Sequence, residues 1–134
     1  MVCFDTDFLI AYLQNNSAAI KKLEELVQQQ AGRDTAAMTT TVNAAELWKD
    51  VYRSKEKQKE EFAKVKWLLD SLELITLDSE SARMVGELDA AIKTSPIGES
   101  DLLIASIALA NKQTVITRNK KHFERVPGLQ VEGW

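Results

Sequence analysis

Three acidic residues stand next to short apolar runs in this sequence. Asp5 ends the first run, Glu46 comes after the second, and Asp101 opens the third. The runs are residues 2–4, 36–40 and 102–110. If the first two are parallel strands and the third is a helix, the three carboxylates meet at the sheet edge where open α/β sheets bind ligands. Carboxylates gathered there stay charged at low cost only when a cation joins them, so the pattern predicts a hard metal ion and metal-assisted chemistry.

A polar pair follows a further apolar run, residues 114–116. Thr117 and Asn119 come directly after this run. They could simply form a polar turn after a strand. They could equally orient a metal-bound water through a hydroxyl and an amide, if that strand ends beside the acids.

Each acid also has an ordinary structural interpretation. Asp5 could end a strand and cap the next helix, and the charge of Asp101 suits the start of a helix. Asp101 differs in that its helix is apolar nearly all round, so its first turn is expected to be less exposed than most. Helical periodicity alone favours a solvated Glu46 that pairs with Lys49 or Arg53.

Other chemistries lack support in the sequence. There is no cluster of histidine and cysteine that would suggest zinc, and no glycine-rich nucleotide-binding loop. His122 is the only histidine and lies in a basic turn, where we interpret it as a surface residue rather than a catalyst. A site made of oxygen ligands favours Mg²⁺ or Mn²⁺.

Two segments are locally basic. The one between residues 49 and 66 mixes lysine and arginine with acids, as a solvated helix face does. The other is denser and lies directly beside the predicted site. Its basic residues are Arg118, Lys120, Lys121 and Arg125. We expect this second segment to hold a phosphate backbone.

Length and composition are those of an ordinary globular protein. We expect one domain, residues 1–134, with 45% hydrophobic and 28% charged residues and a net charge of −3. Cys3 is the single cysteine, so no internal disulfide forms, and its apolar neighbours indicate a core thiol. No apolar stretch is long enough to cross a membrane, and no secretory signal is recognisable. These features predict a cytoplasmic protein that does not bind membranes.

Apolar runs alternate with helical patterns along the whole chain. The predicted strands are residues 2–5, 36–40, 74–77, 114–117 and 129–131. The predicted helices are residues 7–13, 17–31 (capped by Ser17 and stopped by Gly32), 42–52, 55–72, 79–92 (capped by Ser79) and 101–111. This alternation predicts an α/β fold with a mostly parallel, roughly five-stranded sheet covered on both faces.

Four motifs, taken in order, resemble those of the PIN-domain nucleases, and within them the VapC toxins of prokaryotic toxin–antitoxin pairs. The motifs are V-C-F-D-T-D-F-L-I-A-Y-L at 2–13, T-T-T-V-N-A-A-E-L at 39–47, I-G-E-S-D-L-L-I-A-S at 97–106 and V-I-T-R-N-K-K-H-F-E-R-V-P-G-L at 115–129. The resemblance covers essentially the whole chain, including Val131 and Trp134. It implies a PIN-like three-layer α/β/α sandwich and a metal-dependent endoribonuclease.

The resemblance also implies roles for individual residues. Asp5, Glu46 and Asp101 match the three acids that hold the metal in that family, which selects the metal-binding interpretation of Glu46. Asn119 and Thr117 would position the bound water.

One position departs from the family's pattern. The fourth acidic position of many members falls at Asn119, which supplies no negative charge. A second ion would then need help from Asp7 or Glu99, although related toxins are often polar at this position.

The expected function is hydrolysis of RNA phosphodiester bonds by a VapC-like toxin whose partners are RNA and a cognate antitoxin. The alternatives are a PIN nuclease of RNA processing or decay, and a catalytically silent module that binds RNA or protein. We also expect a homodimer, because the family pairs and because Trp67 lies off the main apolar face of its helix. The helices near residues 42–72 would contribute to the dimer interface.

Overall fold

The computed structural model describes residues 1–29 and 37–134. Its centre is a five-stranded sheet in the order β3-β2-β1-β4-β5, and every strand pairs in parallel with its neighbour. The strands are β1 (Val2–Phe4), β2 (Met38–Thr40), β3 (Glu73–Ile75), β4 (Thr114–Ile116) and β5 (Val131–Glu132). The predicted parallel sheet is therefore confirmed, but its strands are shorter than predicted, β3 begins one residue before the predicted run and β5 begins two residues after it.

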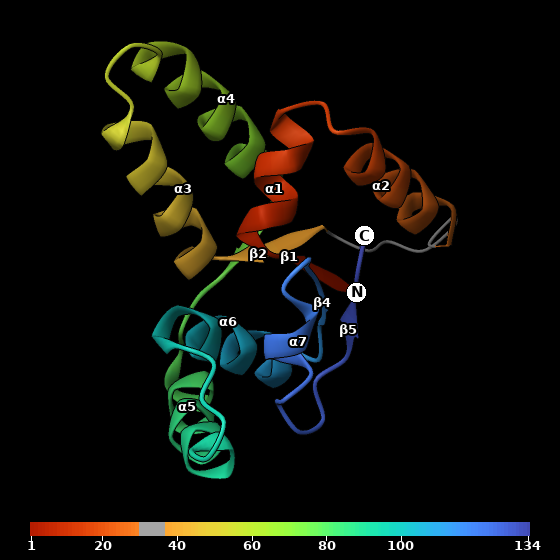
Figure 1. The fold of residues 1–134 in the computed structure, drawn as a ribbon, viewed down its shortest axis with the longest axis vertical. Coiled ribbons are helices and arrows are strands. Elements are labelled where there is room, and N and C mark those ends of the chain that lie inside the picture. The colour runs from red at the N-terminus through yellow and green to blue at the C-terminus, as the bar shows by residue number, and fades with distance from the viewer. Residues whose placement is uncertain (30–36) are drawn as a thin grey trace.

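Helices cover both faces of this sheet (Figure 1). In the described residues they are α1 (Thr6–Leu13), α2 (Ser17–Gln29), α3 (Thr41–Arg53), α4 (Gln58–Asp70), α5 (Ser79–Ile92), α6 (Glu99–Ala110) and α7 (Lys120–Phe123). Because side chains alternate along a strand, Phe4 joins a core with α1 to α4, while Cys3 joins a second core with α5 and α6. The predicted three-layer α/β/α sandwich is confirmed.

Two predicted helix caps were wrong by one residue. Asn16, not Ser17, caps α2, because its Oδ1 accepts hydrogen bonds from the backbone N–H groups of Ala18 and Ala19. Asp78, not Ser79, caps α5. The predicted end of the earlier helix at residues 30–32 and the predicted strand residue 36 lie outside the described residues.

The apolar helix α6 begins two residues earlier than predicted. It starts at Glu99, after Gly98, whose φ of +94° suits glycine far better than other residues. Asp101 therefore lies inside the first turn instead of opening the helix. Ile104, Ala105 and their neighbours are buried, as expected for a helix apolar on nearly every side.

Helix α3 is rotated relative to the apolar face that its sequence suggests. A helical wheel of residues 42–52 groups Ala45 and Tyr52 with the apolar side chains, but Ala45 is exposed and Tyr52 is 64% exposed. The buried residues of the helix are Asn43, Ala44, Leu47 and Val51. The rotation brings Asn43 into the interior and turns Glu46, half-buried, toward α1.

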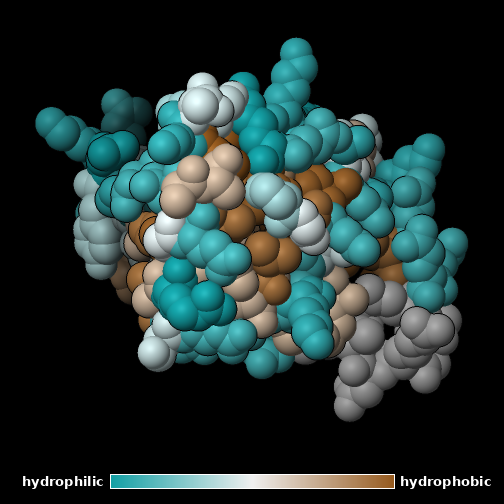
Figure 2. Space-filling model, turned by 90° about the horizontal axis from the view of Figure 1, so that it is seen from below, coloured by the Kyte–Doolittle hydropathy of each residue, from teal (hydrophilic) through white to brown (hydrophobic). Residues whose placement is uncertain are grey.

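The surface seen from below the view of Figure 1 is mainly hydrophilic (Figure 2). Among the described residues, apolar side chains reach the centre of this face, where polar side chains are interspersed with them and surround them. In the part of the chain that the structure describes, no helix combines the length and hydrophobicity needed to span a membrane.

Candidate active site

The candidate site begins where β1 and β4 end, side by side. These strands are paired in parallel with Phe4 opposite Ile116, so the next residues, Asp5 and Thr117, leave the same edge of the sheet. The Thr117 hydroxyl donates a hydrogen bond of 2.7 Å to Oδ2 of Asp5, and both residues are buried. The predicted proximity of these two side chains is a consequence of strand register.

The other carboxylate oxygen of Asp5 is also fully engaged. Oδ1 accepts from the backbone N–H of Thr6 at 2.8 Å, which makes Asp5 the N-cap of α1, and from Nδ2 of Asn43 at 3.0 Å. Asn43 is itself fixed, because its Oδ1 accepts from the hydroxyl of Thr40 at 2.7 Å in the capping box of α3. Asp5 therefore caps α1 and at the same time joins Asn43 and Thr117 in the candidate site.

Glu46 joins the site through Thr6. The Thr6 hydroxyl donates to Oε1 of Glu46 at 2.9 Å, while Nδ2 of Asn43 donates to that same hydroxyl at 2.9 Å. Among residues 1–29 and 37–134, Glu46 forms no ion pair with Lys49 or Arg53. The predicted pairing with Lys49 or Arg53 is therefore not formed, and the half-buried side chain instead accepts a hydrogen bond from Thr6.

Asp101 is connected from the opposite layer through Asn119. Nδ2 of Asn119 donates to Oδ2 of Asp101 at 2.9 Å, and the backbone N–H of Asn119 donates to the Thr117 hydroxyl at 2.9 Å. A continuous chain of hydrogen bonds thus runs from Glu46 to Asp101. We call its members the acid network: Glu46, Thr6, Asp5, Thr117, Asn119 and Asp101.

His122 lies at the edge of the acid network, a place that sequence reasoning did not give it. Its Nδ1 is 3.0 Å from Oδ2 of Asp101 and 2.8 Å from Nδ2 of Asn119. One nitrogen cannot both donate to the carboxylate and accept from the amide, so the two contacts need different tautomers. The sequence did contain one indication of this place: His122 follows Asn119 by three residues, which is about one helical turn.

The two auxiliary acids differ in their relation to the network. Oδ2 of Asp7 accepts from the backbone N–H of Arg118 at 3.0 Å and lies 3.3 Å from the Thr117 hydroxyl. Oδ1 of Asp7 is buried and has no hydrogen-bond partner in the described part of the chain. Glu99 is exposed in the first turn of α6 and forms no hydrogen bond to the acid network within the described residues.

Burial and the charges of nearby acids raise the pKa values of Asp5 and Glu46. Burial is the main cause that raises the pKa of Asp5 to about 6; the charges of Asp7 and Asp101 add to the rise, and the hydrogen bond from Thr117 opposes it. Burial also raises the pKa of Glu46, with a further contribution from Asp101. The carboxylates of three different elements therefore lie within electrostatic reach of one another.

The donor set suits a hard cation, although the carboxylates do not yet converge. They offer only oxygen, and the pKa of Asp5 is raised mainly because the carboxylate is buried, with smaller contributions from the charges of Asp7 and Asp101. As the side chains lie, no three His, Cys, Asp or Glu residues within 1–29 and 37–134 are arranged to hold one ion. Each acid instead accepts bonds from Thr6, Thr117 or Asn119, so the three carboxylates would have to rotate before they could share one ion.

The basic residues predicted to bind RNA surround α7. Lys120 pairs with Glu124 at 3.5 Å, and Arg125 donates to the backbone oxygen of Pro96 at 3.2 Å. Lys121 is exposed and has no ion pair in the described part of the chain. The segment thus keeps positive charge next to Asn119.

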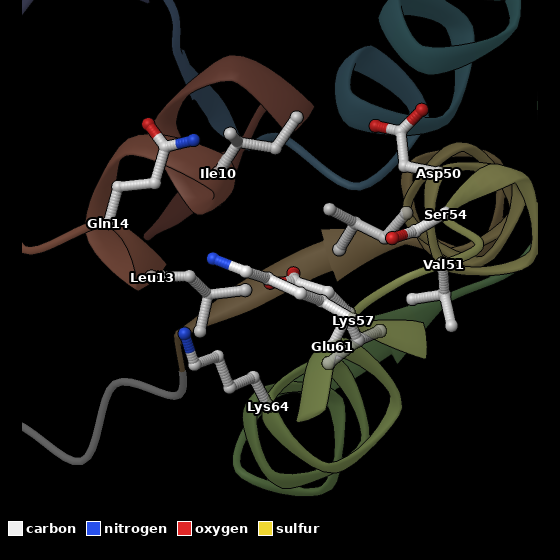
Figure 3. Close-up of a pocket in the computed structure, with 11 residues that line it drawn as sticks. Ile10, Leu13, Gln14, Asp50, Val51, Ser54, Lys57, Glu61 and Lys64 are labelled. Carbon is white, nitrogen blue, oxygen red and sulfur yellow. The ribbon is translucent and has the colours of Figure 1, made fainter. Parts of the chain in front are cut away.

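A hollow of about 340 Å³ lies between α1, α3 and α4 (Figure 3). The amino groups of Lys57 and Lys64 point toward α1 beside Leu13. The hollow shares no lining residue with the acid network. The acids therefore meet at the sheet edge and not in this recess.

Comparison with known proteins identifies relatives of the chain. The model of the PIN domain family matches residues 2–129. The ribonuclease VapC2 of Rickettsia felis is 37% identical over 106 residues, which cover 78% of this chain and 78% of the relative. The tRNA(fMet)-specific endonuclease VapC of Salmonella typhimurium is 28% identical over 119 residues, covering 86% and 89% of the two chains.

A solved structure shows the same architecture over its whole length. It is the VapBC2 complex of Rickettsia felis bound to a DNA fragment from its promoter. The TM-score is 0.87 with 28% identity, and the match covers 100% of this chain and 99% of that one. The agreement extends to the whole α/β/α sandwich.

Proposed function

Because the chain belongs to the PIN-domain family, we propose that the acid network is the active site of a metal-dependent endoribonuclease, the toxin of a toxin–antitoxin pair. The observation that carries this proposal is the unbroken hydrogen-bond chain from Glu46 through Asp5 to Asp101. Relatives named as ribonuclease and as tRNA-specific endonuclease support RNA as the substrate. The reaction is hydrolysis of a phosphodiester bond.

The residues of the site have different roles in this proposed reaction. Asp5, Glu46 and Asp101 would hold Mg²⁺ or Mn²⁺, which lowers the pKa of water and offsets the charge that develops on the phosphate. Thr6 and Asn43 set the orientation of the Asp5 and Glu46 carboxylates through their hydrogen bonds. On the other side of the site, Thr117 and Asn119 direct a hydroxyl and an amide toward the place where the acids meet.

A cleavage assay tests the proposal directly. Purified protein should cut an end-labelled, unstructured RNA at internal positions when Mg²⁺ or Mn²⁺ is present, and should not cut it in EDTA. RNA that is bound but left intact with both metals would instead support the catalytically silent binding module.

An antitoxin partner is proposed from the structural relatives, several of which are VapBC complexes. An acid cluster without a metal attracts a guanidinium, which can bridge carboxylates with two-pronged hydrogen bonds. We therefore propose that the antitoxin inhibits by placing an arginine among these acids, in competition with metal. Co-expression with the neighbouring reading frame separates this toxin from a PIN nuclease of RNA processing, which would need no such partner.

The protein is expected to form a homodimer through α3 and α4. Tyr52 and Trp67 on these helices are 64% and 58% exposed, and Phe62, which lies against Tyr52, is 40% exposed. Exposed aromatic side chains of this kind are enriched at interfaces, and a two-fold interface would pair the same surface on both copies. Sedimentation at micromolar concentration, without antitoxin, should show a dimer that Trp67→Glu shifts toward monomer; a monomeric wild type would contradict the prediction.

Replacing Lys120 and Lys121 together by Ala should weaken RNA binding at all sequences to a similar extent. Phosphate contacts position a strand without reading its bases. The exposed ion pair between Lys120 and Glu124 is weak, so the positive charge of Lys120 remains able to interact with a phosphate. The magnitude of the slope of log K against log salt concentration should fall by up to about 1.4, because each of the two phosphates that is no longer neutralised contributes about 0.7. Lys93→Ala, which removes an exposed charge at the end of α5, is the matched control; an unchanged slope in the double variant would place the binding surface elsewhere.

A further inference from the structure

Arg118 lies on an aromatic ring directly beside the acid network. The centre of its guanidinium is 3.7 Å from the ring centroid of Trp134. That distance is well inside the range of a cation–π contact. The backbone N–H of Arg118 also donates to Oδ2 of Asp7 at 3.0 Å, so the residue that carries this cation is anchored at the site.

The ring under Arg118 is held in place by the core. Trp134 meets Phe8 edge to face, with centroids 5.4 Å apart and planes at 89°. Phe8 in turn stacks on Phe4 at 4.5 Å, and both phenylalanines are buried. An indole supported in this way gives Arg118 a rigid surface.

The strand that leads to Trp134 is fixed as well. The backbone N–H of Thr117 donates to the carbonyl oxygen of Glu132 at 3.0 Å. The Glu132 carboxylate pairs with Lys22 of α2 at 2.8 Å. These interactions hold β5, and with it the ring, next to Thr117.

The guanidinium of Arg118 keeps its charge available. In the described part of the chain it forms no ion pair with a carboxylate, whereas Lys120 pairs with Glu124. Arg118 is exposed, so its N–H groups can reach a ligand while the ring packs against the guanidinium. A planar guanidinium matches a phosphate with two parallel hydrogen bonds, and ordering it in advance lowers the entropy lost on binding.

We propose that Trp134 is a positioning residue that holds Arg118 as a clamp for a backbone phosphate of the RNA strand beside the acid network. This inference rests on the proposed function, since the strand is the substrate of that site. Arg118 contacts the RNA, and Trp134 acts only through Arg118.

The test is the affinity for a short unstructured RNA in EDTA, where no cleavage occurs, measured by fluorescence anisotropy. Trp134→Ala and Arg118→Lys should each raise Kd about three- to tenfold. Trp134→Phe, which keeps a ring, should restore most of the affinity. Arg83→Ala, which removes an exposed arginine of α5, is the matched charge control and should leave Kd unchanged.

A double-mutant cycle on RNA affinity distinguishes a positioning role of Trp134 from a general loss of structure. The double variant Arg118→Ala/Trp134→Ala should bind no more weakly than Arg118→Ala alone, because the ring has nothing left to position. Stabilisation of the protein by Mn²⁺ should be the same in Trp134→Ala and wild type. If Trp134→Ala unfolds, Trp134→Phe and Arg118→Lys still give the comparison with an intact core.

Any of three results would overturn the inference: wild-type RNA affinity in Trp134→Ala, wild-type RNA affinity in Arg118→Lys, or additive losses in the double variant. Any of these results combined with metal-dependent cleavage by wild type would leave the proposed function standing. Failure of wild type to cleave any RNA with Mg²⁺ or Mn²⁺ would contradict the proposed function instead, whatever the Trp134 variants bind.

Discussion

Asp101→Asn is expected to lower metal-dependent RNA cleavage by at least about a hundredfold, the order of effect seen when one electrostatic group is removed from a reacting centre. The substitution removes a charge that the metal needs but keeps the shape of the side chain. Oδ2 of Asp101 accepts from Asn119 and lies near His122, and an amide oxygen can take the same place. The expected loss of cleavage therefore comes from the missing negative charge and not from a change in structure.

The same variant should remain as stable as wild type without metal, within about 1 kcal/mol. Losing a charge in the first turn of α6 costs about 0.3–1 kcal/mol. Relief of the repulsion that Asp101 exerts on Asp5 and Glu46 offsets this cost. Asp101 is not the N-cap of its helix, because Gly98 holds that position, so no capping bond is lost.

Thermal melts with and without Mn²⁺, run beside the cleavage assay, measure both effects. Wild type should gain stability with Mn²⁺ by mass action, since only the folded chain brings the acids together, and Asp101→Asn should lose most of that gain. Glu80→Gln is the matched control, because it removes an acid from the first turn of α5, away from the site. Normal cleavage by Asp101→Asn, or its strong destabilisation without metal, would show that the active site is wrongly placed.

Asp5→Asn is expected to stabilise the metal-free protein at neutral pH. Because the folded pKa of Asp5 is raised from 3.8 to about 6, the folded state holds this proton more tightly than the unfolded state does. The resulting stability is fully present below about pH 4 and is lost as the pH rises through 6. The rise in pKa from 3.8 to about 6 corresponds to roughly 3 kcal/mol, and we expect Asp5→Asn to gain stability on that order or less above pH 7.

The hydrogen bonds around Asp5 can accept the amide. Its oxygen can keep the bonds from the Thr6 N–H and from Asn43, while its NH₂ donates to the Thr117 oxygen. The Thr117 hydroxyl is then free to turn toward Asp7, which already lies 3.3 Å away. The variant should lose cleavage in spite of its added stability.

Denaturant unfolding in EDTA between pH 4 and 8 measures this effect. The curves of wild type and Asp5→Asn should lie close together at pH 4 and diverge as the pH rises. Asp89→Asn, on the exposed side of α5, should follow wild type throughout. Parallel curves for wild type and Asp5→Asn would mean that Asp5 is not destabilised by its surroundings.

Sequence alone predicted the architecture and most of the side chains that the structure brings together in the candidate site. Parallel strands buried on both faces appear as apolar runs, and their alternation with helices implies a covered parallel sheet. Asp5 and Thr117 follow two such runs, so a local rule was enough to place them together. Glu46 was different, because periodicity favoured a solvated side chain and only the family resemblance selected it.

The tertiary structure decided what periodicity leaves open. A helical pattern does not say which neighbour a face meets, and packing against α1 rotates α3 so that Asn43 is buried and Glu46 meets Thr6, 40 residues away. His122 and Trp134 gained their places in the same way, beside Asp101 and under Arg118. These partners lie on separate elements, so their positions depend on how the layers pack and not on any short-range pattern.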